Sequence, residues 1–157
     1  MQKITPFFWF NNNAEEAMKF YVSVFPNSKM VGVTRYGDGG PKKKGKVMTG
    51  IFRINGQEFI ALNGGPHVKF NEGVSFVVNC ATQHEIDRLW NKLSQGGKPG
   101  HCGWLKDKYG LSWQIIPTIL GQLMIDKDPK RSERVIHAMM RMKKLDIKKL
   151  KQAKAGK

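Results

Sequence analysis

The side chains best suited to bind a metal or attack a substrate are three histidines and one cysteine: His67, His84, His101 and Cys102. His101 and Cys102 are adjacent, and neighbouring residues of a strand point to opposite faces, so they are not expected to share a ligand. His84 falls in the first turn of an expected helix, where it faces solvent. A Cys102 nucleophile would need a histidine or a helix N-terminus to lower its pKa. We therefore expect structural or incidental roles for all four.

One stretch has the spacing of a phosphate-binding loop. Residues 40–46 place Gly40, Gly45 and Lys46 at P-loop positions. Val47 then stands where a Ser or Thr must hold Mg²⁺, and a strand is expected where a P-loop continues into a helix. We interpret the stretch as a basic hairpin loop. The chain also lacks the G-x-S-x-G motif of hydrolases and the glycine-rich dinucleotide fingerprint.

Composition indicates a globular chain with an uneven charge. The 157 residues are 40% hydrophobic, enough for one domain or two small modules sharing a core. The formal net charge is +15, and residues 126–157 hold 12 of the 27 Lys and Arg residues but only 4 of the 12 Asp and Glu residues. Such a tail permits non-specific nucleic-acid binding. Because no aromatic–Arg stacking motif accompanies it, we favour solvated helix faces and expect no nucleic-acid partner.

The chain shows no sign of membrane insertion or secretion. Its longest apolar runs, residues 4–10 and 115–120, are far shorter than the roughly 20 residues of a membrane span. The N-terminus lacks the small-residue cleavage site of a signal peptide. Cys80 and Cys102 form neither a metal-type spacing nor a disulfide framework. These features predict a cytoplasmic protein.

Hydrophobic periodicity predicts two successive series of elements. Residues 3–10 form a strand, Asn13 and Glu16 form a capping box, and a helix runs to residue 25. Strands follow at residues 29–36, 46–54 and 58–62, the last two joined by a hairpin turn. The second series has a strand at residues 74–80, a capping box of Thr82 and Glu85, a helix, and short strands up to residue 117.

The two series form an internal repeat. An offset of 69 residues aligns the apolar helix positions and, without a gap, the first strands: Phe20 with Leu89, Tyr21 with Trp90, Val24 with Leu93, Phe7 with Phe76 and Phe8 with Val77. One strand–helix–three-strand module cannot close a core alone, so we expect a pair of βαβββ modules.

The second series ends in a hairpin, residues 102–117, and a helical tail follows. Gly110 supplies the positive φ of the hairpin turn, and Asp107 is expected to cap this turn rather than act as a base. In the tail, residues 119–126 form a short helix and Asp128 caps a helix to about residue 144. Asp146 caps a last helix. The apolar stripe of the tail is expected to dock on the body or on a partner subunit, and it comprises Val135, Ile136, Met139, Met140 and Met142.

These features resemble the PhnB-like, or demethylubiquinone methyltransferase-like, branch of the vicinal oxygen chelate (glyoxalase/bleomycin-resistance) superfamily. The resemblance lies in residues 5–7, 14–17, 20–21, 25–26, 102–117 and 134–148. It implies an α+β fold of two βαβββ modules of the glyoxalase/bleomycin-resistance/dihydroxybiphenyl dioxygenase type with a C-terminal helical extension. The modules would span about residues 1–66 and 72–118 of a single domain, residues 1–125, followed by the basic extension 126–157. It also implies a homodimer.

The resemblance further implies where a metal would be held. The superfamily usually binds a divalent metal through His and Glu on the first and last strands of each module. Residues 3–10 and 74–79 contain no His, Asp, Glu or Cys. Gln114 stands at the usual Glu position of the last strand, while Asn63 and Glu58 are the nearest candidates on the fourth. We therefore expect no metal site and no cofactor.

What remains is a pocket on the concave side of the sheets. Its candidate residues are Thr5, Phe7, Trp9, Asn63, Trp104 and Gln114. The competing interpretation is that the aromatic members fill the core. We expect a small-molecule-binding protein; the alternative is a glyoxalase- or dioxygenase-type metalloenzyme, and the third possibility a nucleic-acid-associated module. No cofactor motif supports methyl transfer, so whether the protein is an enzyme stays open.

Overall fold

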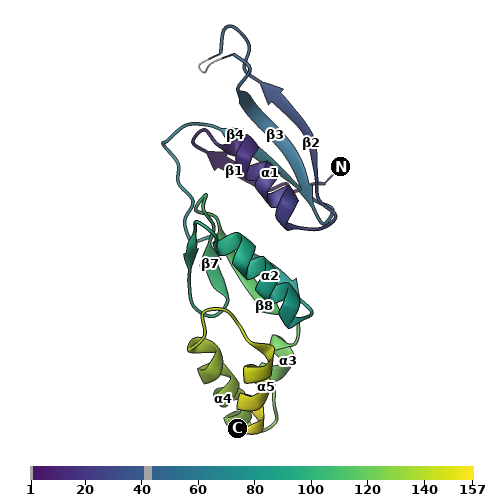
Figure 1. Cartoon of the computed structure of the whole chain (residues 1–157), viewed down its shortest axis with the longest axis vertical. Helices are drawn as coiled ribbons and strands as arrows, with labels where there is room; N and C mark the ends of the chain where they lie inside the picture. The colour runs from purple at the N-terminus through teal and green to yellow at the C-terminus, as the bar shows by residue number, and fades with distance from the viewer. Residues whose placement is uncertain (1, 41–43) are drawn as a thin grey trace. The chain divides into compact units, whose positions relative to one another are not determined.

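The computed structural model describes residues 2–40 and 44–157 and divides into two compact units, residues 1–70 and 71–157 (Figure 1). Pro41, Lys42 and Lys43, which belong to the phosphate-loop-like stretch, lie outside the described residues. Each unit contains one four-stranded sheet with a helix across one face. We call that face of each sheet its helix face and the opposite side its open face.

The first unit has the predicted βαβββ order. Its elements are β1 (Phe7–Phe10), α1 (Ala14–Val24), β2 (Lys29–Arg35), β3 (Val47–Ile54) and β4 (Gln57–Asn63). The sheet order is β1-β4-β3-β2, with β1 parallel to β4 and the other pairs antiparallel. Proline cannot donate to a ladder, and β1 begins just after Pro6. The three-strand meander of β2, β3 and β4 follows α1 as the hairpin signals predicted.

Aromatic side chains fill the space between this sheet and α1. Phe8 contacts Phe59 with ring centroids 5.3 Å apart, and Phe52 stacks on Phe59 at the same distance. From the helix, Tyr21 stacks on Phe52 at 6.1 Å. All four rings are buried. Aromatic rings remove large apolar areas from water, so this cluster is the main reason why α1 packs on this face.

The second unit repeats the order and adds three helices. It comprises β5 (Ser75–Cys80), α2 (Gln83–Ser94), β6 (Lys98–Pro99), β7 (Trp104–Lys106) and β8 (Ser112–Pro117), then α3 (Leu120–Met124), α4 (Pro129–Met140) and α5 (Ile147–Ala155). The sheet order β5-β8-β7-β6 matches that of the first unit strand for strand. On its helix face, Leu105, Trp113 and Ile115 are buried, as are Ile86, Leu89, Trp90 and Leu93 of α2. The chain is thus an α+β protein of two βαβββ modules with C-terminal helices.

The C-terminal helices are docked onto the second module rather than extended. Val135, Leu145 and Leu150 form a small core with Leu120 and Leu123 of α3. The loop between α4 and α5 is fixed at two places: Cys102 N donates to Met142 O at 2.8 Å, and Gly103 N donates to Lys143 O at 2.8 Å. Met139 and Met142 pack partly on this core, as the docking interpretation predicted, but Met140 is 61% exposed. In addition, α4 ends at Met140, earlier than predicted.

Two further predictions about local structure were wrong. The side chain of Asn13 makes no capping hydrogen bond, so the first capping box does not form, whereas Thr82 accepts from Glu85 N at 3.2 Å as expected. The ungapped alignment of the first strands is also wrong. Phe8 is buried on the helix face, whereas Val77 is 52% exposed, because three residues separate β1 from α1 but only two separate β5 from α2. A shift of one residue moves a strand side chain to the other face.

Within the described residues, none of the helices combines the length and the apolar character needed to cross a membrane.

Candidate functional site

The open face of the second sheet carries two cross-strand rows of side chains. Strand register places Ser75 beside Ser112, Ser112 beside Lys106, and Lys106 beside Lys98, so one polar row crosses all four strands. Side chains paired in this way stand about 5 Å apart at Cβ. The next row comprises Val77, Gln114 and Trp104. The period of two along β8 therefore brings Ser112 and Gln114 to the same face.

A small pocket lies over part of this face. Its volume is about 180 Å³, and it is lined by Glu72, Lys98, Pro99, Gly100, Trp104, Leu105, Lys106 and Ser112. Pockets for drug-sized ligands have volumes of roughly 300–1,000 Å³, so this smaller pocket has room for a functional group and a small body. Beside it, Gln114 Nε2 donates to Ser75 Oγ at 2.9 Å, which fixes the orientation of the amide.

Two polar groups of the pocket differ in how they are satisfied. Lys106 forms an ion pair with Glu72, and the hydrogen bond from Lys106 lowers the pKa of Glu72 below its usual value. Ser112 is 1% exposed, and its hydroxyl has no hydrogen-bond partner within the described residues. Buried polar groups in proteins are nearly always hydrogen-bonded. Ser112 therefore stands out as a group for which the protein itself supplies no partner in the described part of the chain.

Two of the pocket candidates of the first unit, Phe7 and Trp9, lie on the open face of that unit. Phe7 is 53% exposed, and Trp9 is half-buried beside Leu62 of β4. The Trp9 indole Nε1 donates to Gly65 O at 3.0 Å, and a Cβ on Gly64 would collide with the indole ring. Thr5 is half-buried just before β1. Trp9 is thus held by the loop after β4, which gives it a structural task whether or not it also contacts a ligand.

Asn63 does not join this group, because it faces the helix. It is 3% exposed, its Oδ1 accepts from Ala14 N at 2.8 Å, and its Nδ2 donates to Val47 O at 2.9 Å. A side chain from the end of β4 therefore caps α1 in place of Asn13. Of the six predicted pocket residues, Trp104 and Gln114 are cross-strand neighbours in β7 and β8. Phe7 and Trp9 lie on the same face of β1. The structure assigns Asn63 to helix capping.

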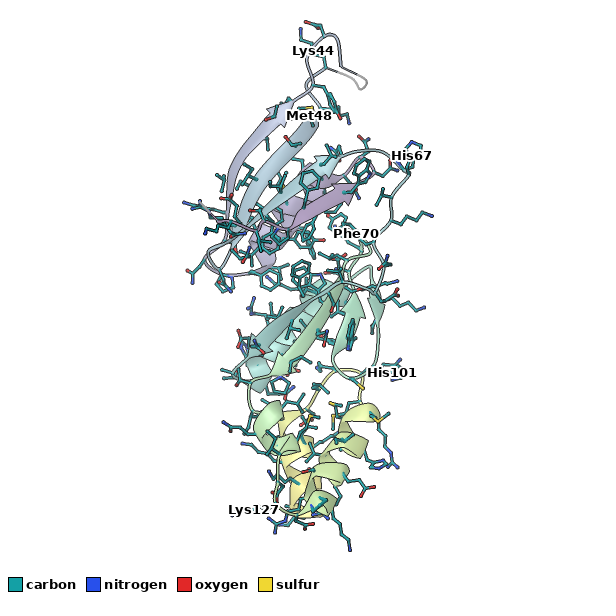
Figure 2. All side chains as sticks on the ribbon, turned by 180° about the vertical axis from the view of Figure 1, so that it is seen from behind. Lys44, Met48, His67, Phe70, His101 and Lys127 are labelled. Carbon is teal, nitrogen blue, oxygen red and sulfur yellow. The ribbon has the colours of Figure 1, made fainter. Side chains whose placement is uncertain are left out.

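The histidines and cysteines do not assemble into a reactive centre. His67, His84 and His101 are exposed, and Figure 2 shows His67 in the loop after β4 and His101 in the loop before β7. Cys102 has a φ of 55° in that same loop, so the prediction that it lies in a strand with His101 was wrong. Burial raises the pKa of the Cys80 thiol to about 12. Among the residues that the structure describes, no three His, Cys, Asp or Glu side chains come together as metal ligands.

The turn between β7 and β8 is fixed by Asp107, as predicted. Asp107 is 3% exposed, and its carboxylate accepts from Tyr109 N at 2.9 Å, Leu111 N at 3.1 Å and Trp113 Nε1 at 2.8 Å. Gly110 adopts a φ of 90° in the same turn, which only glycine enters freely. Asp107 therefore holds the hairpin that carries Lys106, Ser112 and Gln114, and it is not placed as a catalytic base.

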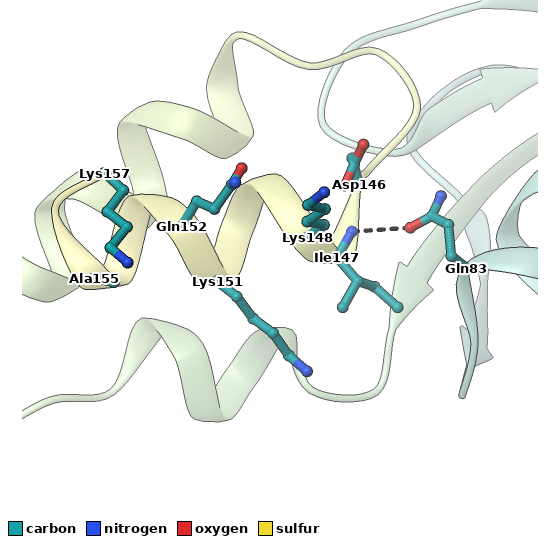
Figure 3. Close-up of a pocket in the computed structure, with 8 residues that line it drawn as sticks. All are labelled: Gln83, Asp146, Ile147, Lys148, Lys151, Gln152, Ala155 and Lys157. Carbon is teal, nitrogen blue, oxygen red and sulfur yellow. Dashed lines mark hydrogen bonds between the residues drawn. The ribbon is translucent and has the colours of Figure 1, made fainter.

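A second hollow of about 550 Å³ lies between α5 and the start of α2 (Figure 3). Gln83 lines it, but the Gln83 amide is already engaged. Its Oε1 accepts from Ile147 N at 2.9 Å, and its Nε2 donates to Leu145 O and Asp87 Oδ1, each at 3.1 Å. Gln83 thus joins the C-terminal helices to α2, and we assign this hollow a structural origin.

Residues 2–116 match the family model described as 3-demethylubiquinone-9 3-methyltransferase. A PhnB protein from Bacillus cereus that carries the same description is 41% identical, with a TM-score of 0.69, and the match covers 74% of this chain and 100% of that one. This chain belongs to that PhnB-like family. Its two βαβββ modules have the arrangement that the resemblance to the vicinal oxygen chelate superfamily predicted.

Two further solved structures are similar to this chain. A Staphylococcus aureus protein is 35% identical, with a TM-score of 0.35, over 73% of this chain and 94% of that one. A Pseudomonas aeruginosa protein is 22% identical, with a TM-score of 0.61, over 74% and 98%, and it supports the fold. A search of curated proteins found no match. The PhnB-like match ends at residue 116, so the resemblance that we inferred for residues 134–148 lies outside it.

The strands that hold a divalent metal in this superfamily carry no suitable ligand set here. In β4, Glu58 is paired with Arg53 at 3.0 Å, and Asn63 caps α1. In β8, Gln114 is a neutral amide bonded to Ser75. In β5, Cys80 is buried on the helix face as a thiol. Each of these side chains is thus engaged in a contact within the protein, and the part of the chain that the structure describes gathers no three His, Cys, Asp or Glu side chains as metal ligands.

Sequence reasoning missed the polar row. It singled out Trp104 and Gln114 but not Ser75, Ser112, Lys106 or Lys98. The alternation along residues 111–116 already placed Ser112 on the side of Gln114. The cross-strand partners depend on register, which the alternation of one strand does not specify.

Proposed function

We propose that this PhnB-like protein binds a small organic molecule on the open face of the second sheet and does so without a metal. The observation that supports this proposal best is the pocket lined by Trp104 and Ser112. The Ser112 hydroxyl is buried there and has no hydrogen-bond partner among the described residues. An indole wall with a few polar groups is the usual composition of a small-molecule site. The neighbouring Gln114 amide adds a group that orients a ligand.

Metal independence is part of the same proposal. It is supported by the donor positions: Gln114 is bonded to Ser75, Glu58 to Arg53, and Asn63 to the first turn of α1. The alternative is a metalloenzyme of the glyoxalase or dioxygenase type. That function requires at least three donors around an open position. We further propose a homodimer in the cytoplasm, which light scattering and fractionation would test.

Two measurements test the proposal. The first is the metal content of protein purified without chelator, followed by thermal-shift titrations with Zn²⁺, Ni²⁺, Mn²⁺ and Fe²⁺. We expect no stoichiometric metal and no saturable shift; one equivalent of metal with a saturating shift would favour the metalloenzyme. The second is an NMR fragment screen with neutral and charged compounds. We expect binders that shift the indole resonance of Trp104 but not that of Trp90, which lies on the buried face of α2. A screen without such binders would refute small-molecule binding at this face.

A further inference from the structure

The polar row on the second sheet combines one buried hydroxyl with two ammonium groups. Ser112 and Lys106 are direct partners across β8 and β7, and Lys98 is the partner of Lys106 across β7 and β6. All three residues line the pocket of about 180 Å³. Because they come from three adjacent strands in register, they stand side by side on one face of the sheet.

Ser112 is the reason to expect a hydrogen-bonding ligand. A hydroxyl that is 1% exposed without a partner in the described structure has lost its contacts with bulk water and gained none from the protein. Such a group costs stability unless something else reaches it.

The charges around Ser112 decide which kind of ligand fits. Two ammonium groups and one carboxylate line the pocket, so the lining is net positive and repels a cation. The carboxylate, Glu72, already contacts Lys106 from a side chain that is 64% exposed. An oxyanion in the pocket would take the place of Glu72 beside Lys106. It would also accept a hydrogen bond from Ser112, and such charge-assisted bonds are the stronger kind.

The apolar part of the lining limits what the oxyanion is attached to. Trp104 and Pro99 supply an indole and a ring beside the two lysines. The volume leaves room for a small body only. We propose that this pocket binds the oxyanion head, a carboxylate or a phosphate-type group, of a small organic molecule with a flat apolar body. This inference rests on the proposed function and names the class of its ligand.

The roles of the residues follow from their chemistry. Ser112 donates its hydroxyl proton to one oxygen of the head group. Lys98 and Lys106 neutralise its charge, and Trp104 packs against its body. Glu72 is a competitor, because it occupies Lys106 when the ligand is absent. Removing Ser112 should therefore weaken binding, whereas removing the charge of Glu72 should strengthen it. Opposite signs from two residues of one pocket are not expected from a general loss of structure.

The probes are benzoate and phenylphosphonate, which share a phenyl body and carry two kinds of oxyanion, with neutral benzamide as the matched control. Inorganic phosphate separates binding of the head alone from binding that needs the body. Titrations are followed by ¹H–¹⁵N NMR at the Ser112 and Lys106 amides and the Trp104 indole. We expect saturable shifts with the two aromatic anions, weaker shifts with phosphate, none with benzamide, and loss of affinity as salt is raised.

Four variants test the residue roles. Ser112→Ala should raise the dissociation constant by about tenfold, the effect of a lost hydrogen bond to a charged group. Lys98→Met should weaken binding several-fold and flatten the salt dependence. Its control is Lys92→Met, which removes one exposed charge from α2 and should change nothing. Glu72→Gln should tighten binding roughly two- to fivefold, the range of an exposed ion pair.

Ser112→Ala has a second readout that does not need a ligand. In buffer without oxyanions, this variant should melt at the same temperature as the wild type or slightly higher, because a buried hydroxyl without a partner is exchanged for a methyl group. A clear fall in melting temperature would show that the hydroxyl already has a structural partner, and it would overturn the inference.

The remaining outcomes separate this inference from the proposed function. Equal binding of benzamide and benzoate, or binding that Glu72→Gln weakens, would overturn the oxyanion class while small-molecule binding stands. The same holds if neutral fragments shift the Trp104 indole and none of the anions does, in which case water satisfies Ser112. If neither neutral nor anionic fragments perturb this face, both proposals fail.

Discussion

Asp107 is predicted to be the residue on which the geometry of the β7–β8 hairpin depends most. Its buried carboxylate accepts hydrogen bonds from two backbone amides and from the Trp113 indole, at 2.9, 3.1 and 2.8 Å. Hydrogen bonds to a charged group contribute about 1.5–3 kcal/mol each, and their losses are not additive. Asp107→Ala should therefore lower the free energy of unfolding by about 3–5 kcal/mol, since it also leaves the indole N–H buried without an acceptor.

Asp107→Asn gives the sharper test, because it keeps the shape of the side chain. The amide oxygen can still accept from the backbone of the turn, but the amide nitrogen would face the Trp113 donor. We expect a loss of about 2–3 kcal/mol. Trp113→Phe removes the indole donor and keeps the aromatic packing. A double-mutant cycle of Asp107→Ala with Trp113→Phe should give a coupling energy of about 1.5–3 kcal/mol.

The assay is urea unfolding followed by far-UV circular dichroism, with amide hydrogen exchange in β8 to locate the effect. The matched control is Asp38→Asn, whose carboxylate is 82% exposed and paired only with Lys44 among the described contacts; it should unfold like the wild type. If Asp107→Asn is as stable as the wild type, or if the coupling energy is below about 0.5 kcal/mol, the carboxylate does not hold the hairpin.

Three other regions give predictions of their own. Asn63→Ala should cost about 1–2 kcal/mol because α1 loses its cap, whereas Asn13→Ala should cost a few tenths; equal effects in urea unfolding would contradict the capping assignment. Burial raises the pKa of Cys80 to about 12, so the reactive thiolate is scarce at pH 8 and iodoacetamide should modify only Cys102 in the folded protein, as peptide mass spectrometry would show. Gln83→Ala should speed amide exchange in α5 and leave that in α1 unchanged, because Gln83 ties the C-terminal helices to α2; uniform acceleration would instead indicate global destabilisation.

The helices could be predicted from the sequence because their signals are local. Thr82 and Glu85 are three residues apart and form the expected cap of α2. The apolar residues of each helix are spaced with the helical period, and Tyr21 in α1 and Trp90 in α2 are buried as this spacing predicts. The cap of α1 could not be predicted in this way, since Asn63 lies 49 residues from the amide that it accepts from. Local rules favoured Asn13, but the end of the neighbouring strand supplies an acceptor that is already buried and oriented.

Strand faces were harder to predict because one residue reverses them. Helix positions align at an offset of 69, yet the links between strand and helix differ by one residue, so Phe8 is buried while Val77 is exposed. Within one strand the faces follow from the period of two, and Phe7 and Trp9 indeed lie opposite Phe8 in β1. Which residues meet across strands depends on register, and the row from Ser75 to Lys98 emerged only from the pairing of four strands.

The two modules differ most on their open faces, against which their own helices do not pack. Their helix faces must close a core, and both are apolar. No helix of the same module packs on the open faces, so these faces need not be apolar. One row of the first open face consists of Phe7, Ile60 and Ile51, whereas the polar row of the second contains Ser112, Lys106 and Lys98. These two rows differ in character, and under the proposed function the cationic row of the second module is the one that binds the ligand. Substitutions of Ser112, Lys106 or Lys98 in this polar row should therefore change ligand binding far more than stability. In contrast, Trp113→Ala, on the helix face of β8, should cost about 3–5 kcal/mol of stability.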